Sequence, residues 1–179
     1  MAILVLILAF LLTASPTASV TYTCAPSAPC GCSTAMATVS KIVGGENAVQ
    51  GSWGWAVALT YDSNELSCGG SILSSSWIIT AAHCVDGLDA SPFSVYAGSI
   101  EFRSNSQMRT VRRIFAHPYY NAKSVVNDIA LLELSSPLNM TDANVAKICL
   151  PASTDERYPP DESTVNASYC WNERSAFND

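Results

Sequence analysis

Two polar residues beside apolar segments are the candidates for chemistry in this sequence. His83 follows the apolar segment 77–80, and Asp128 directly precedes the apolar segment 129–134. A carboxylate that is drawn partly into an apolar interior needs a polar partner. The upstream histidine could be that partner if both segments belong to one barrel. A histidine that is oriented by a carboxylate can activate a hydroxyl nucleophile, and this is the functional alternative for the pair.

Both residues also have ordinary interpretations. His83 could be a packed histidine, and Asp128 could cap a strand at a turn. A metal site at His83 is the other alternative. We expect no metal there, because the adjacent Cys84 should be oxidised and the chain has no second His-Cys pair.

The elements that must position these residues are short strands. Turn residues separate the apolar or alternating segments, and only 81–85 resembles a single helical turn. Many short strands with frequent turns are typical of an all-β barrel or sandwich. The expected strands are 56–61, 70–73, 77–80, 93–97, 110–115 and 129–134.

Composition excludes several classes of protein. The 179 residues are 49% hydrophobic and 13% charged, which excludes a disordered chain. Nine basic residues against fifteen acidic ones give a net charge of −6. A nucleic-acid partner is therefore not expected, since phosphates require a basic face. The length predicts one domain.

The N-terminus predicts export. Residues 3–12 are an unbroken apolar run followed by small residues. The run is too short for a membrane span, which needs about 20 residues, and it fits the core of a signal peptide over residues 1–19. A short buried helix is the alternative. We therefore expect a secreted, extracellular protein without a membrane span.

The seven cysteines agree with that compartment, where thiols oxidise to disulfides. An odd count leaves at least one cysteine over. Two glycosylation sequons, at Asn139 and Asn166, fit the same compartment, although each alone is a weak signal.

Several motifs, in order along the chain, resemble the trypsin and chymotrypsin type of serine peptidase. The resemblance covers residues 41 to about 151 and implies an antiparallel β-barrel that is the N-terminal half of the two-barrel trypsin-like fold. The motifs lie at 41–45, 51–55, 68–73, 77–84, 114–121, 128–132 and 148–151.

The resemblance assigns roles to individual positions. His83 matches the general base, and Asp128 matches the carboxylate that holds this histidine in one tautomer. Lys41 and Ile42 match a zymogen activation bond, with an exposed linker as the alternative. His117 matches a position that begins a surface loop and is not expected to be catalytic.

The resemblance also implies two disulfides. Cys68 and Cys84 match the pair that closes the loop of the catalytic histidine. Cys149 matches a cysteine that ties the propeptide to the body, and Cys32 is its expected partner. Connectivity cannot be read from sequence alone. This choice leaves Cys24 and Cys30 to pair locally, with Cys170 left over.

The apolar N-terminus and the resemblance together divide the chain into four expected parts. We expect a signal peptide at 1–19, a propeptide strap at 20–41, the first barrel at 42–162 and a divergent tail at 163–179. Two-barrel enzymes need about 200–250 residues, so the second barrel is expected to be largely missing.

The nucleophile of the family is not found in the sequence. It lies in a Gly-Asp-Ser-Gly-Gly string, which does not occur here. The family implies protein or peptide substrates for the full-length form, an activating protease that cleaves after Lys41, and no cofactor. The chain as written is expected to be inactive. The alternatives are a non-catalytic secreted binding module or a degenerate fragment.

Overall fold

The structure is a computed structural model, which describes residues 20–22, 27–35, 37–39, 47–62 and 65–151. Its elements are β1 Val20–Tyr22, β2 Ala37–Val39, β3 Ala56–Tyr61, β4 Cys68–Ser74, β5 Trp77–Thr80, the 3-10 turn η1 Ala82–Cys84, β6 Phe93–Ala97, β7 Gln107–Ala116 and β8 Ala130–Leu134. Several predictions lie outside the described residues: the signal peptide 1–19, the activation bond Lys41–Ile42, the sequon at Asn166 and the tail 163–179.

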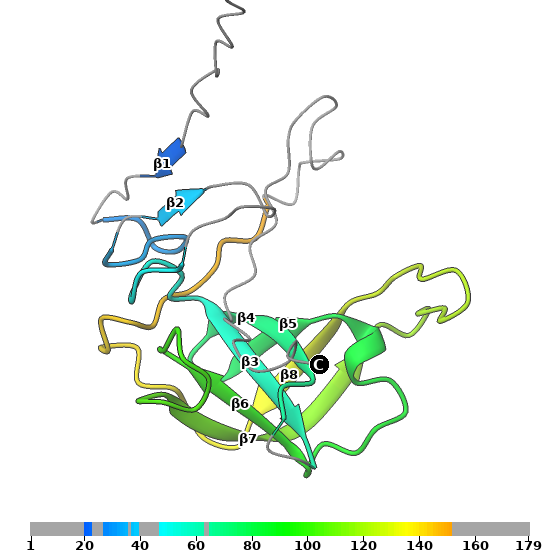
Figure 1. The fold of residues 1–179 in the computed structure, drawn as a ribbon. Coiled ribbons are helices and arrows are strands. Elements are labelled where there is room, and N and C mark those ends of the chain that lie inside the picture. Colours follow the sequence, from blue (N-terminus) through cyan, green and yellow to red (C-terminus); the bar gives the residue numbers. More distant parts are fainter. Residues whose placement is uncertain (1–19, 23–26, 36, 40–46, 63–64, 152–179) are drawn as a thin grey trace, which may run out of the picture.

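Six strands close into an antiparallel barrel in the order β3-β4-β5-β8-β7-β6 (Figure 1). The predicted all-β barrel is therefore confirmed. β3, β5 and β6 have the predicted bounds, whereas β4 and β7 extend beyond them at both ends. Among the described residues, no helix is long and apolar enough to cross a membrane.

The barrel interior is filled by apolar side chains that alternate along the strands. β8 follows the pattern directly, since Ala130, Leu132 and Leu134 are buried and the residues between them are half-buried. Removal of this apolar surface from water is the main stabilising contribution. The largest fully buried side chains are Phe93, Leu59, Ile72, Ile78, Leu132, Val57, Val85 and Val95.

One glycine lets two barrel strands approach closely. A Cβ atom at Gly70 of β4 would lie 2.9 Å from Ile78 Cγ2 and 2.9 Å from the carbonyl oxygen of Ile79, both on β5. Neither contact is tolerable for a carbon atom, so this position of β4 needs glycine. The close approach sets the position of β5, which leads directly into the segment that carries His83.

The described residues before the barrel include a pair of short strands. β1 and β2 pair antiparallel, with Thr21 opposite Thr38. Residues 27–35 lie against the barrel body, where the Gly31 N–H donates to the Lys147 carbonyl at 2.7 Å and the Gly54 N–H donates to Ser33 Oγ at 2.9 Å.

The predicted pairing of Cys149 with Cys32 is wrong. The structure joins Cys30 to Cys149, with 5.1 Å between their Cα atoms, so Cys30 does not pair locally either. The reason is a turn at Gly31, where φ is +69° and a Cβ atom would lie 3.0 Å from Cys149 Sγ. This turn and the bond to Lys147 bring Cys30 to Cys149. Cys32 is itself disulfide-bonded.

Candidate active site

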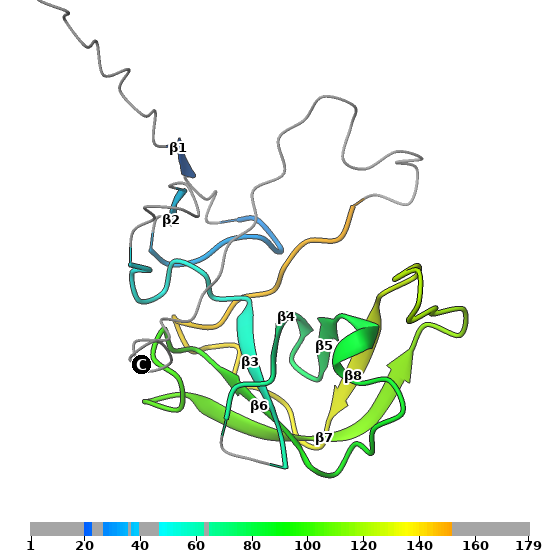
Figure 2. The same cartoon turned by 45° about the vertical axis from the view of Figure 1, so that its right-hand side comes forward.

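The two candidate residues meet because the end of β5 lies opposite the start of β8. Thr80 pairs with Ala130 in the antiparallel register. His83 follows Thr80 by one short turn, η1, and Asp128 stands just before β8. The green turn and the start of the yellow strand accordingly lie at the same end of the barrel (Figure 2).

Asp128 binds His83 through both of its carboxylate oxygens. Oδ2 lies 2.7 Å from the ring Nδ1, and Oδ1 accepts the backbone N–H of His83 at 2.8 Å. A carboxylate accepts hydrogen bonds only, so Nδ1 carries the proton in this contact. That assignment leaves the lone pair of a neutral ring on Nε2.

Hydrogen bonding keeps Asp128 charged. The hydrogen bond from the His83 ring, followed by the one from the His83 backbone, lowers the pKa of Asp128 below its ordinary value. The Asp128 side chain is 19% exposed and the His83 side chain is 57% exposed. The carboxylate therefore lies behind the ring, and the ring faces solvent.

Tyr120 lies close enough to Asp128 for the charge of that carboxylate to affect its phenol. Partial burial, followed by the nearby carboxylates of Asp128 and Asp86, raises the pKa of the Tyr120 phenol. The charge of Asp128 therefore acts on the phenol of Tyr120 as well as on the ring of His83.

A disulfide fixes the turn that carries His83. Cys84 of η1 is joined to Cys68 at the start of β4, the pairing that the resemblance implies. Cys84 Sγ also lies 3.5 Å from His83 Nε2. The two sulfurs and the ring lie within 4.8 Å of one another, but sulfurs bonded to each other offer no thiolate to a metal ion.

His117 has a different place in the structure. Its Nδ1 accepts the Tyr119 N–H at 3.2 Å, and its own N–H donates to the Ile129 carbonyl at 3.0 Å. These bonds start the loop between β7 and β8, as expected for a loop-forming residue.

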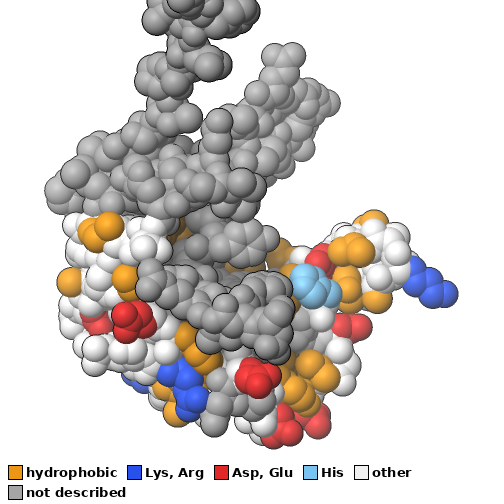
Figure 3. Space-filling model, viewed as in Figure 1, with side chains coloured by type: hydrophobic (Ala, Val, Ile, Leu, Met, Phe, Trp, Pro, Cys, Tyr) orange, Lys and Arg blue, Asp and Glu red, His pale blue; other side chains and the backbone are white. Residues whose placement is uncertain are grey.

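Hydrophobic side chains are exposed along that loop. Tyr119 is 78% exposed, Val125 58%, Val126 53% and Ile129 43%. In Figure 3 histidine atoms reach the surface beside hydrophobic side chains of this loop. One of these exposed side chains, Ile129, directly follows Asp128 in the chain.

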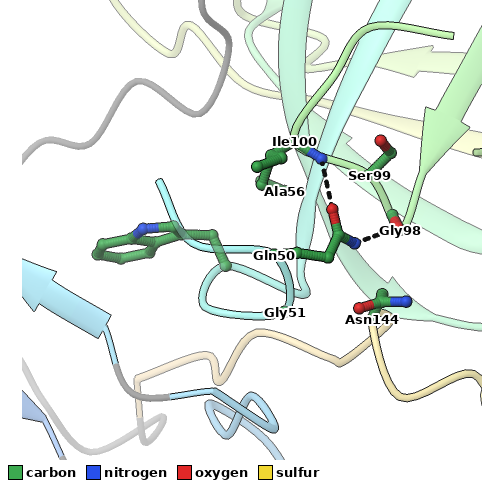
Figure 4. Close-up of a pocket in the computed structure, with 8 residues that line it drawn as sticks. Gln50, Gly51, Ala56, Gly98, Ser99, Ile100 and Asn144 are labelled. Atoms are coloured by element: carbon green, nitrogen blue, oxygen red, sulfur yellow. Dashed lines mark hydrogen bonds between the residues drawn. The ribbon is translucent and has the colours of Figure 1, made fainter. Parts of the chain in front are cut away.

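Two further features lie away from the pair. Asn139 is exposed, and its Oδ1 accepts both the N–H of Thr141 at 3.0 Å and the hydroxyl of Thr141 at 2.7 Å. The other feature is a shallow, open cavity beside Gln50, whose side-chain amide donates to the Gly98 carbonyl at 2.8 Å and accepts the Ile100 N–H at 3.2 Å (Figure 4). Sequence reasoning did not find this cavity. Its lining carries no charged side chain, so it offers no catalytic group.

Comparison with known proteins agrees with this architecture. A solved structure with a similar fold is that of the scabies mite inactivated protease paralogue S-D1, with 34% sequence identity and a TM-score of 0.51. The match covers 55% of this chain and 41% of that one, so this chain spans about two fifths of the solved chain. The family model described as Trypsin matches residues 42–174. This match covers most of the sequence, and the chain belongs to the trypsin family.

Proposed function

We propose that this chain supplies the general base and the orienting carboxylate of a serine endopeptidase. The observation that carries the proposal is the 2.7 Å contact between His83 Nδ1 and Asp128 Oδ2, on a ring that is 57% exposed. In this role His83 takes the proton of a serine hydroxyl at Nε2 as the hydroxyl attacks a peptide carbonyl. Asp128 holds the required tautomer and stabilises the imidazolium that forms.

The attacking serine has to come from residues other than these 179. The sequence contains no Gly-Asp-Ser-Gly-Gly string, so the pair has no family nucleophile to activate. By itself the described barrel would orient a base and cleave no peptide bond. Substrate preference would depend on the same additional residues.

The proposal also includes secretion of the protein and its activation by cleavage. Disulfides at Cys30–Cys149 and Cys68–Cys84 favour an oxidising compartment, consistent with a secreted protein. Cleavage after Lys41 by an activating protease would free the amine of Ile42. The disulfide from Cys30 to Cys149 would keep residues before that bond attached to the barrel.

A second candidate is a secreted binding module without catalysis. It is favoured by the missing nucleophile string and by the similarity to the scabies mite inactivated protease paralogue S-D1. Retention of both His83 and Asp128 favours the first proposal, because a binding module needs neither residue.

Sequencing of the mature transcript through the codon for Asp179 separates the two candidates. The peptidase proposal expects the frame to continue into a Gly-Asp-Ser-Gly-Gly segment. The product should then hydrolyse peptides and react with a fluorophosphonate, and a His83→Ala variant should do neither at a measurable rate. A stop codon after Asp179 in every transcript would reject the peptidase proposal and leave the binding module.

A further inference from the structure

The Cys68–Cys84 disulfide lies beside the ring of His83. His83 Nε2 lies 3.5 Å from Cys84 Sγ, and Nδ1 of the same ring is held by Asp128. An imidazolium next to a cysteine stabilises its thiolate, which lowers the pKa of the thiol. The thiolate with the lower pKa is also the better leaving group when a disulfide is attacked.

We infer that the Cys68–Cys84 disulfide is a site of thiol–disulfide exchange, in which Cys84 is the leaving sulfur and His83 stabilises it. The substrate class is a small thiol or an exposed protein thiol. This inference goes beyond the proposed peptidase function, because the exchange needs no serine.

The exchange balances in two steps. The thiolate of a reduced glutathione attacks Cys68 Sγ, the bond between the two cysteine sulfurs breaks, and Cys84 departs as a thiolate. A second glutathione thiolate then attacks the sulfur of the first glutathione, which yields oxidised glutathione and a thiolate on Cys68. The protein disulfide is reduced, and two glutathiones are oxidised by two electrons in total.

The groups around the His83 ring favour Cys84 as the leaving sulfur. The carboxylate of Asp128 lies 2.7 Å from Nδ1 of the ring, on the nitrogen that does not face Cys84. A ring that carries a proton on each nitrogen stabilises the Cys84 thiolate as that sulfur leaves.

The Cys30–Cys149 disulfide provides an internal reference. Cys149 is exposed, whereas both Cys68 and Cys84 are half-buried. If access alone set the rate, the Cys30–Cys149 bond would be reduced first. Stabilisation of the leaving thiolate by His83 predicts that the Cys68–Cys84 bond is reduced first. Control by access and stabilisation by His83 therefore predict opposite orders in one sample.

The experiment treats the full chain with reduced glutathione, stops the reaction with acid and locates the adducts by peptide mass mapping. We expect Cys68–Cys84 to react about tenfold faster than Cys30–Cys149, with glutathione on Cys68 and a free thiol on Cys84. His83→Ala should slow the Cys68–Cys84 reaction about tenfold and leave the Cys30–Cys149 rate unchanged.

His117→Ala is the matched control, because it removes the other imidazole and should leave both rates unchanged. Glutathione found on Cys84, or a Cys68–Cys84 rate equal in the native chain and in His83→Ala, would overturn the inference. The position of the adduct is read on the native chain, so that part of the test does not depend on the folding of any variant. Loss of peptidase activity would not affect either readout.

Discussion

Asp128 accepts two hydrogen bonds from His83, one from the ring Nδ1 at 2.7 Å and one from the backbone N–H at 2.8 Å. The carboxylate thus fixes the side chain of the histidine and the backbone of the turn η1 together. Each of these two donors is bound by a different oxygen of the carboxylate. The orientation of the ring and the position of the turn therefore depend on the same charge.

Replacement of Asp128 by Asn should change the tautomer of His83. The amide keeps one acceptor oxygen and gains donors, and a donor facing Nδ1 favours the ring that carries its proton on Nε2. Nitrogen-15 NMR of the imidazole measures this ratio directly. Asp89→Asn, at an exposed aspartate, is the control and should leave the ratio unchanged. An unaltered ratio in Asp128→Asn would contradict the assigned role of Asp128.

Acid should destabilise the barrel through two carboxylates. Hydrogen bonds lower the pKa of Asp128, through the His83 ring, and the pKa of Glu133, through Arg113. A carboxylate whose pKa is lower in the folded state stabilises the fold at pH values above its ordinary pKa of about 4. This stabilisation is lost as the pH falls through the folded-state pKa. The free energy of unfolding should therefore fall from pH 5 downward.

Urea unfolding between about pH 6 and pH 2 checks this prediction. Asp128→Asn and Glu133→Gln should each make the pH dependence shallower, because neither variant has a carboxylate left to titrate at that position. The control Asp89→Asn should follow the native profile. Equal slopes in all four proteins would contradict the prediction.

Val125 adopts a backbone conformation that β-branched residues avoid. Its φ is +53°, and its side chain is 58% exposed, so strain is not offset by burial. Asn tolerates this region, and Val125→Asn should raise the free energy of unfolding by about 1 kcal/mol. Urea unfolding measures the change. Val126→Asn is the matched control, since Val126 is similarly exposed and is not among the positive-φ residues described. An equal gain in both variants would reject strain as the cause.

Asn139 should carry a glycan when the chain is expressed in secreting eukaryotic cells. Its side chain is exposed, and the Thr141 hydroxyl bonds to its Oδ1 at 2.7 Å, so the sequon is accessible. Asn139→Gln and Thr141→Ala should each increase electrophoretic mobility, whereas Thr141→Ser should migrate as the native chain does. The same mobility for native and Asn139→Gln proteins would show that the site is unused.

Much of the barrel follows from local sequence patterns. β3, β5 and β6 begin and end where apolar runs meet turn residues, so their bounds could be predicted. β7 begins earlier than predicted because Gln107, Met108 and Arg109 pair with β6 although their side chains lack an apolar pattern. Backbone pairing of this kind depends on the neighbouring strand and leaves little trace in the sequence.

The sequence predicts the two residues of the candidate site but not all of their contacts. Family motifs identify His83 and Asp128, and the structure brings them together. The backbone bond from His83 to Asp128 and the approach of Cys84 to the ring depend on the path of η1, which sequence does not specify. The choice of Cys30 over Cys32 likewise depends on the turn at Gly31.

A chimera tests the central claim most directly. Residues 42–151 of this chain replace the corresponding half of an active trypsin-family peptidase, so that His83 and Asp128 face a serine from the second barrel. After activation the chimera should hydrolyse peptides, and His83→Ala should lower kcat at least about 10³-fold, whereas His117→Ala should not. A folded chimera without activity, or one whose activity survives His83→Ala, would contradict the proposed role of the His83–Asp128 pair.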